Sequence, residues 1–171
     1  CQALADLQTV EETFGEEKLK LVYIGDGNNV ANSFAVTAAK LGHEVVICTP
    51  PGYESADEAY QFSNVTHHYR PTEAVAGAHA VYTDVFVSMG DEAEAEERLR
   101  DLAPYQVNAA LLELADPDAV FMHCLPAHRG EEVTAEVIDG PRSVVWQQAE
   151  NRLPTEEAIL YALIAGRWEL P

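Results

Sequence analysis

The stretch AVFMHCLPAHRG, residues 119–130, is an apolar run that ends in polar and reactive residues. Residues 119–122 are apolar without alternation, which indicates a strand covered on both faces of a parallel sheet. Pro126 then ends the strand, because proline has no N–H for the next ladder bond. In open α/β sheets ligands bind outside the carboxyl ends of strands, so this turn is expected to face a ligand.

Alternating strand and helix patterns surround this stretch. Further strands are expected at residues 18–24, 44–48, 65–69, 79–85 and 143–146. Apolar spacings of three and four predict helices at residues 3–14, 30–41, 55–62, 106–114, 131–138 and 154–164, with Ser55 as an N-cap and a short helix opened by Pro71. The sequence therefore predicts a single α/β domain, with a doubly wound, Rossmann-like parallel sheet flanked by helices.

The composition is that of an acidic globular domain. The 171 residues are 47% hydrophobic and 23% charged, which suits one domain with its own core. Ten Lys and Arg against 29 Asp and Glu give a formal charge of -19, which argues against a nucleic-acid or anionic-membrane surface. The lysines are Lys18, Lys20 and Lys40 alone. Such a surface resembles proteins of a salt-rich cytoplasm, where counterions screen self-repulsion.

Cysteine usage and hydropathy favour a reducing cytoplasm. Cys1, Cys48 and Cys124 are widely spaced without a C-x-x-C pair, which suggests neither a disulfide framework nor a zinc site. No apolar run approaches the ~18 residues needed to cross a bilayer, and no signal sequence opens the chain. The chain begins without Met, inside an expected helix, so we expect a fragment of a longer protein.

The first candidate ligand turn is Gly25-x-Gly27, after the first expected strand. It lacks the third glycine of a dinucleotide fingerprint, since Val30 occupies that position, and no acidic residue ends the following strand. NAD binding is therefore disfavoured. The amides of Asn28 and Asn29 can donate and accept, which suits the carboxylate and amino groups of an amino acid. They can equally bond their own backbone or cap the helix.

The second candidate is the loop after the strand at residues 79–85. Asp84 lies at the strand end, where its carboxylate could hold an ammonium group. Ser88 and the Met89 backbone N–H could add hydrogen bonds, because backbone beside Gly90 can approach a ligand closely. Such a loop is also compatible with an ordinary turn. The carboxylates that follow at residues 91–97 are interpreted as a solvated helix face and not as a metal site.

The third candidate is the turn that follows the strand at residues 119–124. Cys124 can be a nucleophile, a metal ligand, a polarizable partner for a substrate amine, or a buried structural residue. His123 is its neighbour in a strand and is expected on the opposite face, while His128 lies beyond Pro126. The spacing of these two histidines and the cysteine matches no standard metal site, so no metal is predicted.

Taken together, these turns resemble one family. GDGNN at residues 25–29, D-x-x-x-SMG at 84–90, HCLP at 123–126 and ENR at 150–152 occur in the order and spacing of the second domain of ornithine carbamoyltransferase. The likeness runs from Cys1 nearly to Ile164. Aspartate carbamoyltransferases share the fold and a similar His-x-Leu-Pro turn but lack the Ser-Met-Gly loop. The choice of ornithine therefore rests on that loop.

The resemblance implies a substrate and a set of contacts. Four positions match those that hold the α-amino and α-carboxylate groups of L-ornithine: Asn29, Asp84, Ser88 and the backbone of Met89. The δ-amine of ornithine must be unprotonated to attack carbamoyl phosphate, and a pocket of low dielectric with acceptors helps it lose its proton. The products implied are citrulline and phosphate, and no cofactor is implied.

Four further positions match the reacting end of the family's site. Cys124 and the Leu125 carbonyl match residues near the δ-amine of ornithine. Gln2 matches a residue that touches the carbamoyl group, and Arg152 matches an arginine that binds carbamoyl phosphate and braces the tetrahedral intermediate. The resemblance therefore implies that Cys124, Arg152 and Asp84 are the catalytic residues.

The resemblance also implies that half of the active site lies outside this chain. The Ser-x-Arg-Thr motif of the family's first domain, which binds carbamoyl phosphate, does not occur here. We expect the chain alone to have negligible activity, since losing one positioned contact typically costs ~10²–10³ in rate. The full-length enzyme is expected to be a homotrimer formed through the absent domain. Leu4, Leu7 and the closing helix would pack against that domain, so exposed apolar patches are expected.

Two alternatives stay open. One is an amino-acid-binding regulatory domain without catalysis, which Gln2 and Arg152 disfavour because an ornithine sensor needs no carbamoyl contacts. The other is a sister carbamoyltransferase that acts on putrescine or an acylated ornithine. Asn29, Asp84 and Ser88 disfavour putrescine, which is not a zwitterion.

Overall fold

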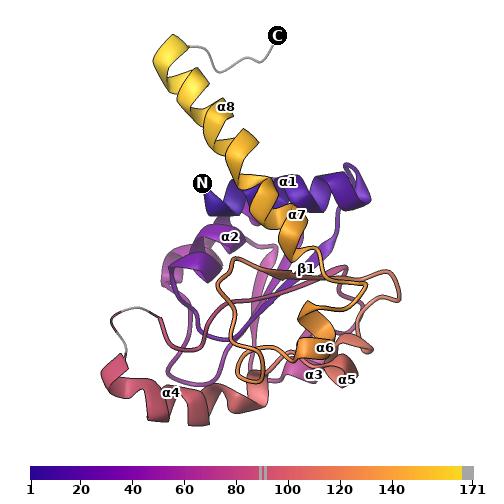
Figure 1. The fold of residues 1–171 in the computed structure, drawn as a ribbon, viewed down its shortest axis with the longest axis vertical. Helices are drawn as coiled ribbons and strands as arrows, with labels where there is room; N and C mark the ends of the chain where they lie inside the picture. Colours follow the sequence, from indigo (N-terminus) through magenta and orange to yellow (C-terminus); the bar gives the residue numbers. More distant parts are fainter. Residues whose placement is uncertain (89, 91, 167–171) are drawn as a thin grey trace.

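The protein folds around a five-stranded parallel sheet (Figure 1). The computed structural model describes residues 1–88, 90 and 92–166. The strands are β1 (Lys20–Ile24), β2 (Glu44–Cys48), β3 (Val65–His68), β4 (Ala80–Thr83) and β5 (Val120–His123). They lie in the order β3-β2-β1-β4-β5, and the four pairings are all parallel. The order changes direction between β1 and β4, as in doubly wound folds, so the predicted fold class is confirmed.

Helices cover both faces of the sheet. The α-helices are α1 (Gln2–Phe14), α2 (Asn29–Lys40), α3 (Pro71–Ala74), α4 (Ala95–Leu102), α5 (Ala109–Leu112), α6 (Ala135–Ile138), α7 (Val145–Glu150) and α8 (Arg152–Ala165). Short 3₁₀ turns are η1 (Asp57–Gln61), η2 (Glu92–Glu94) and η3 (Ala103–Tyr105). One apolar cluster joins α1 and α2 to one face of the sheet, and a second joins α3, α5 and α6 to the other (Figure 1).

The predicted strand at residues 143–146 is wrong. Ser143 makes a single parallel bridge with Phe121, and the chain then enters α7 at Val145. The next donor along β5, the His123 N–H, binds the Gln148 side chain of α7 at 2.9 Å. A helix side chain therefore takes the place of a sixth strand at this edge.

Several predicted helices are shorter than expected. Residues 55–62 form only the 3₁₀ turn η1, whose N-cap residue is Ala56, so the capping role predicted for Ser55 is wrong. The segment 106–114 contains the one-turn helix α5, capped by the Asn108 side chain. The segment 131–138 contains only α6. Residues 55–62 pack against the first apolar cluster, and the other two segments pack against the second. All three form short turns because their apolar residues pack inward without a full helical stripe.

Helix α8 extends away from the body of the domain (Figure 1). Its apolar side chains are largely exposed, among them Leu160 at 56% and Ile164 at 84%, which confirms the predicted apolar patch. Leu4 is likewise exposed at 46%. Leu7 is buried against the α2 side of the sheet, so its predicted packing against another domain is wrong. In the part of the chain that the structure describes, no helix combines the length and hydropathy of a membrane span.

Candidate functional site

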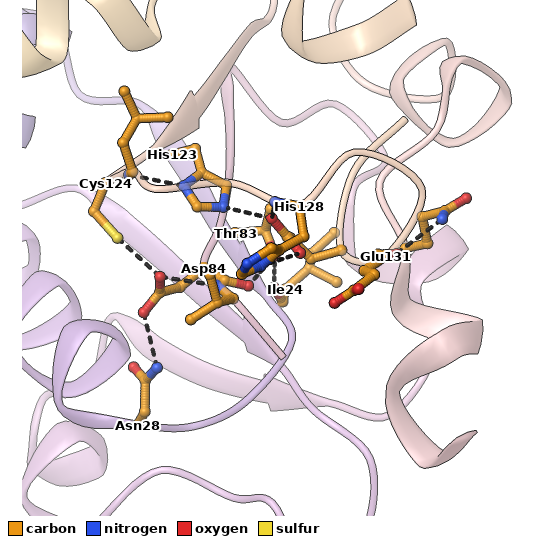
Figure 2. Close-up of polar contacts among 12 residues, drawn as sticks. Ile24, Asn28, Thr83, Asp84, His123, Cys124, His128 and Glu131 are labelled. Atoms are coloured by element: carbon orange, nitrogen blue, oxygen red, sulfur yellow. Dashed lines mark hydrogen bonds and ion pairs between the residues drawn. The ribbon is translucent and has the colours of Figure 1, made fainter. Parts of the chain in front are cut away.

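Polar side chains from three strand ends meet at the carboxyl edge of the sheet, where the strand order changes direction (Figure 2). Asn28 follows β1, Asp84 follows β4 and Cys124 follows β5. Because parallel strands present all their carboxyl ends at one edge, turns that are far apart in sequence become neighbours here. The three predicted ligand turns are thus brought together, at the position where doubly wound folds bind their ligands.

Asp84 is the centre of this cluster and is only 8% exposed. Its Oδ1 accepts hydrogen bonds from the Val85 N–H at 2.8 Å and from the Cys124 thiol at 3.0 Å. Its Oδ2 accepts a hydrogen bond from Asn28 Nδ2 at 3.0 Å. An ionised carboxylate has about four acceptor sites, so Oδ2 can take a further donor. The cluster therefore presents an oriented anion that suits an ammonium group.

Both the oxygen and the nitrogen of the Asn28 side-chain amide form hydrogen bonds within the fold. Its Oδ1 accepts hydrogen bonds from the N–H groups of Val30 at 2.9 Å and Ala31 at 3.2 Å, which caps α2, while its Nδ2 holds Asp84. The capping alternative for Asn28 is therefore confirmed. Asn29 is exposed in the first turn of α2, and its side chain makes no hydrogen bond with residues 1–88, 90 or 92–166. It is free to meet a ligand.

Backbone conformation and close packing explain why the first turn contains Gly25 and Gly27. Gly25 has a φ of +131°, which disfavours a side chain there. At Gly27 a Cβ atom would lie 2.3 Å from Ser55 N and 2.5 Å from Tyr53 O. The Gly27 N–H also donates to Tyr53 O at 2.9 Å. The pair thus lets the loop after β2 pack directly on this turn, and a dinucleotide phosphate is not needed to explain it.

The Cys124 side chain acts as a thiol. Burial, and then the neighbouring charge of Asp84, raise the pKa of Cys124 well above its ordinary value. A thiolate is the nucleophilic form of cysteine and the form that binds metals, so both of these alternatives are disfavoured. The sulfur remains a polarizable surface beside the Asp84 carboxylate, in line with the predicted contact with a substrate amine.

A buried histidine and carboxylate hold the turn after β5. His123 Nδ1 accepts a hydrogen bond from the Leu125 N–H at 2.9 Å, so Nε2 carries the proton that it shares with Glu132 Oε1 at 3.1 Å. Glu132 is fully buried, and the same oxygen accepts the His128 N–H at 2.6 Å. Leu125 has a φ of +56°, which non-glycine residues rarely adopt. Its carbonyl accepts no hydrogen bond from the described residues and is open to a ligand.

Cys124 and His123 lie on opposite sides of the sheet, as predicted. Cys124 packs against the apolar cluster that includes α1 and α2, whereas His123 meets Glu132 beside Val133 of the other cluster. Among the described residues, metal-ligating atoms lie within 4.8 Å of one another in two groups: Asp84, His123 and Cys124, and His128, Glu131 and Glu132. Both nitrogens of His123 and one oxygen of Glu132 are already used in hydrogen bonds, so neither group is a prepared metal site.

The loop after β4 is tied to α4. Arg98 donates from Nε to Phe86 O at 3.0 Å and pairs with Asp26 in the first turn. Ser88 is half-buried, and its hydroxyl makes no hydrogen bond with residues 1–88, 90 or 92–166. Met89 lies outside the described residues, so its contact stays a prediction.

Gln2 and Arg152 lie side by side at the beginnings of α1 and α8. Arg152 Nη1 donates to Gln2 Oε1 at 2.9 Å, and Nη2 pairs with Glu156 at 2.7 Å. The Arg152 side chain is 46% exposed. Neither residue makes a hydrogen bond with the Asp84 cluster within the described chain, so the structure brings the predicted carbamoyl phosphate residues together as a second, separate group.

Three buried polar residues of this region were missed in the sequence: Asp6, Glu132 and Gln148. Glu132 and Gln148 hold the turn after β5, and Asp6 receives hydrogen bonds from α1, β4 and α7. A signal was present for Asp6, because the polar residues at positions 2, 6, 9 and 13 recur with helical spacing beside the apolar stripe. For the other two, no local pattern distinguishes them from solvated residues.

Comparison with known proteins identifies related sequences. The sequence profile of the family described as "Aspartate/ornithine carbamoyltransferase, Asp/Orn binding domain" matches residues 17–163. The chain is 55% identical to the ornithine carbamoyltransferase of Bacillus subtilis, over 96% of this chain and 54% of that protein. It is 54% identical to that of Methanothermobacter thermautotrophicus, over 96% and 58% respectively. The chain thus spans about half the length of the curated relatives it matches.

Solved structures show the same likeness. The ornithine carbamoyltransferase of Pyrococcus furiosus superposes with a TM-score of 0.89 at 51% identity, over 94% of this chain and 55% of that chain. The anabolic ornithine carbamoyltransferase of Campylobacter jejuni superposes with a TM-score of 0.90 at 34% identity, over 97% and 58%. The similarity therefore extends to both sequence and fold.

Proposed function

Because the chain belongs to the aspartate/ornithine carbamoyltransferase family, we propose that residues 1–171 are the L-ornithine-binding domain of an ornithine carbamoyltransferase. The observation that carries the proposal of an amino-acid ligand is the Asp84 carboxylate. A carboxylate that is almost buried at the switch point of the sheet, and oriented by Asn28 and Cys124, favours a compact ammonium ligand. A site for NAD would need a different first turn.

In this proposal the zwitterionic end of ornithine is held at the β1 and β4 turns. Asp84 Oδ2 pairs with the α-ammonium group. The exposed amide of Asn29, the hydroxyl of Ser88 and the backbone N–H of Met89 supply donors for the α-carboxylate. The unused hydrogen-bonding capacity of Asn29 and Ser88 within the described chain supports these assignments.

The δ-amine of ornithine is placed between the Cys124 sulfur and the Leu125 carbonyl. Both are acceptors in a partly buried setting, which favours the neutral amine over the ammonium form. The neutral amine attacks the carbonyl carbon of carbamoyl phosphate and forms a C–N bond. The C–O bond to phosphate then breaks, and the amine proton leaves with the phosphate, giving citrulline. Cys124 and Asp84 thus shape the site of attack without a covalent intermediate.

Gln2 and Arg152 are proposed to meet the carbamoyl phosphate. The guanidinium of Arg152 suits the charge that develops on the tetrahedral intermediate. Most donors for the phosphate are proposed to lie in an N-terminal domain outside this chain, through which full-length subunits form a homotrimer. The exposed apolar residues of α8 and Leu4 support such packing, and this chain alone is expected to have negligible activity. Free thiols at Cys1, Cys48 and Cys124 support a cytoplasmic location.

The test is an amide NMR titration of the chain with L-ornithine in high KCl. Saturable shifts are expected at Asn29, Asp84, Ser88 and Cys124. Putrescine, L-aspartate, an acylated ornithine and NAD serve as comparison ligands and should leave these resonances in place. Saturation by L-aspartate or NAD, without a response to ornithine, would refute the proposal.

Two variants sharpen this test. Asp84→Asn removes the proposed partner of the α-ammonium, so ornithine affinity should fall by about 10²-fold, the loss typical of a buried charge-paired contact. Asp118→Asn is the control, since Asp118 is exposed just before β5 begins, at the amino ends of the strands and so away from the Asp84 cluster. Equal ornithine affinity in the two variants would show that Asp84 is not the ammonium site.

A further inference from the structure

Asp6 is a buried carboxylate that none of the proposed ligand contacts uses. It lies in α1 and is 0% exposed. Its Oδ1 accepts hydrogen bonds from Gln2 Nε2 at 2.6 Å and from Gln148 Nε2 at 2.7 Å. Its Oδ2 accepts the Tyr82 hydroxyl at 3.0 Å. One carboxylate therefore joins the start of α1, strand β4 and helix α7.

Two chains of hydrogen bonds lead outward from this carboxylate. In the first chain, Gln2 Oε1 accepts a hydrogen bond from Arg152 Nη1 at 2.9 Å. In the second chain, Gln148 Oε1 accepts a hydrogen bond from the His123 N–H of β5 at 2.9 Å. The ring of His123 in turn accepts the Leu125 N–H. The first chain ends at Arg152, and the second ends at the N–H of Leu125, the residue whose carbonyl is proposed to lie beside the δ-amine.

The polarity of both chains depends on an acceptor at Asp6. A glutamine amide can rotate by half a turn and exchange its donor and acceptor ends. Because Nε2 of Gln2 points at Asp6, its Oε1 must face Arg152. Because Nε2 of Gln148 points at Asp6, its Oε1 must face the His123 N–H. A donor in place of the carboxylate would favour flipped amides, and a flipped Gln148 would set two donors against each other at His123.

The charged and titratable groups around Asp6 are few. The Tyr82 hydroxyl of β4 donates a hydrogen bond to Asp6. The positive charge of Arg152 in α8 stabilises the ionised form of Asp6. The negative charge of Asp6 in turn raises the pKa of Cys124, which follows β5. Burial raises the pKa of Asp6 to about 6, although its hydrogen bonds and the charge of Arg152 oppose the shift. At neutral pH the group is ionised and accepts all three hydrogen bonds, whereas in mild acid it carries a proton.

We propose that Asp6 is a positioning residue that holds the Gln2–Arg152 pair and the turn His123–Leu125 in one fixed relation. It touches neither ligand and acts through the two glutamine amides. The identities of the ligands rest on the proposed function, but the positioning itself is a property of the free chain. It can therefore be tested without a substrate.

The first experiment compares two variants of α1 in the ligand-free chain. Asp6→Asn replaces one acceptor oxygen by a donor. Glu12→Gln is the matched control, because Glu12 also accepts from three side chains, those of Gln8, Gln147 and Asn151, and touches neither Gln2 nor Gln148. Asp6→Asn should move the side-chain amide resonances of both glutamines and the backbone amides of His123 and Leu125. Glu12→Gln should leave them in place.

A pH titration of the unaltered chain keeps the proposal testable if Asp6→Asn does not fold. The Asp6 carboxyl carbon should titrate with a midpoint of about 6. The side-chain amides of Gln2 and Gln148 and the His123 and Leu125 backbone amides should follow the same midpoint. Resonances of these four residues that ignore both the titration and the variant would overturn the positioning role.

Ornithine affinity separates this inference from the proposed function. Asp6→Asn should weaken L-ornithine binding by about tenfold, equivalent to about 1.4 kcal/mol, and Glu12→Gln by less than about twofold. If the unaltered chain does not bind ornithine, the proposed function fails while the amide resonances still decide the role of Asp6. If Asp6→Asn binds ornithine as tightly as the unaltered chain, the proposed function stands and the positioning role is wrong.

Discussion

The Cys124 thiol donates a hydrogen bond of 3.0 Å to Asp84 Oδ1, so the turns after β5 and β4 are joined at their polar residues. Burial, and then the neighbouring Asp84 carboxylate, keep the cysteine in its thiol form at neutral pH. A thiolate there would face a carboxylate in a partly buried setting, and both burial and charge oppose its formation. The pair therefore offers an ammonium ligand one full negative charge and a soft, neutral neighbour.

Thiol reactivity tests this pairing. At about pH 8, the ordinary pKa range of a free cysteine, iodoacetamide should modify exposed Cys1 readily and Cys124 much more slowly. Cys48 should also resist, because burial raises its pKa to about 12. Asp84→Asn removes the negative neighbour, so alkylation of Cys124 should accelerate while that of Cys48 stays the same. Peptide mass spectrometry measures all three rates, and fast modification of Cys124 in the unaltered chain would contradict the pairing.

The buried carboxylate of Glu132 should matter more to stability than that of its neighbour. Glu132→Gln weakens the acceptor of the His123 ring and the His128 N–H, so the free energy of unfolding should fall by about 2–3 kcal/mol. Glu131→Gln is the control, because Glu131 is exposed, and should change it by less than about 0.5 kcal/mol. Urea unfolding at constant KCl measures both, and equal effects would refute the assigned role of Glu132.

The close approach at Gly27 predicts a large cost for a single methyl group. Gly27→Ala would bring Cβ to 2.3 Å from Ser55 N, so the loop after β2 must shift and stability should fall by about 2–4 kcal/mol. Gly52→Ala is a useful comparison. Its Cβ meets nothing within 4 Å, and it should cost only the strain of a φ of +89°, about 1–2 kcal/mol. Denaturation that ranks Gly52→Ala as the more harmful change would contradict the packing described here.

Ionisation of Asp6 should oppose folding. Its pKa rises from 3.8 in the unfolded chain to about 6, so between these values the folded state binds more protons and the free energy of unfolding falls as pH rises. Protonated Asp6 contributes about 3 kcal/mol to the free energy of unfolding. This contribution is fully present below pH 3.8 and is lost above about pH 6. Acids with lowered pKa values, such as Glu12 and Asp139, act in the opposite direction.

A difference measurement isolates this effect. The stability of the unaltered chain minus that of Asp6→Asn cancels the other acids and should decrease by about 2–3 kcal/mol from pH 4 to pH 7. Chemical unfolding at a series of pH values provides the data. A difference that is constant, or that grows with pH, would show that Asp6 is not buried as an acid.

The formal charge of -19 predicts salt-dependent stability. KCl screens the repulsion among the exposed carboxylates, so the melting temperature should rise between about 0.1 M and about 1 M KCl. Sucrose at matched osmolarity controls for general solvent exclusion and should give a smaller rise. A melting temperature that does not respond to KCl would count against adaptation to a salt-rich cytoplasm.

Much of the fold follows from local pattern. Unbroken apolar runs such as residues 119–122 require cover on both faces, which only a parallel sheet between helix layers provides. The candidate site follows in turn, because the turns after β1, β4 and β5 must share one edge of that sheet. The strand predicted at residues 143–146 failed for a local reason. Its apolar residues suit a strand, but the β5 donor that it would have paired with binds the Gln148 side chain.

What the sequence by itself determined is therefore the layered α/β fold, the polar turns at the strand ends, and the loop at residues 84–90 as the most discriminating of them. Only the tertiary structure decided that Asn28 caps α2 and holds Asp84, that Leu7 is core, and that Asp6 is buried. The bond between Asp6 and Gln148 spans 142 positions, and that between His123 and Glu132 spans nine. A polar residue can be buried only when such a partner satisfies it, and no local periodicity records which distant side chain that will be.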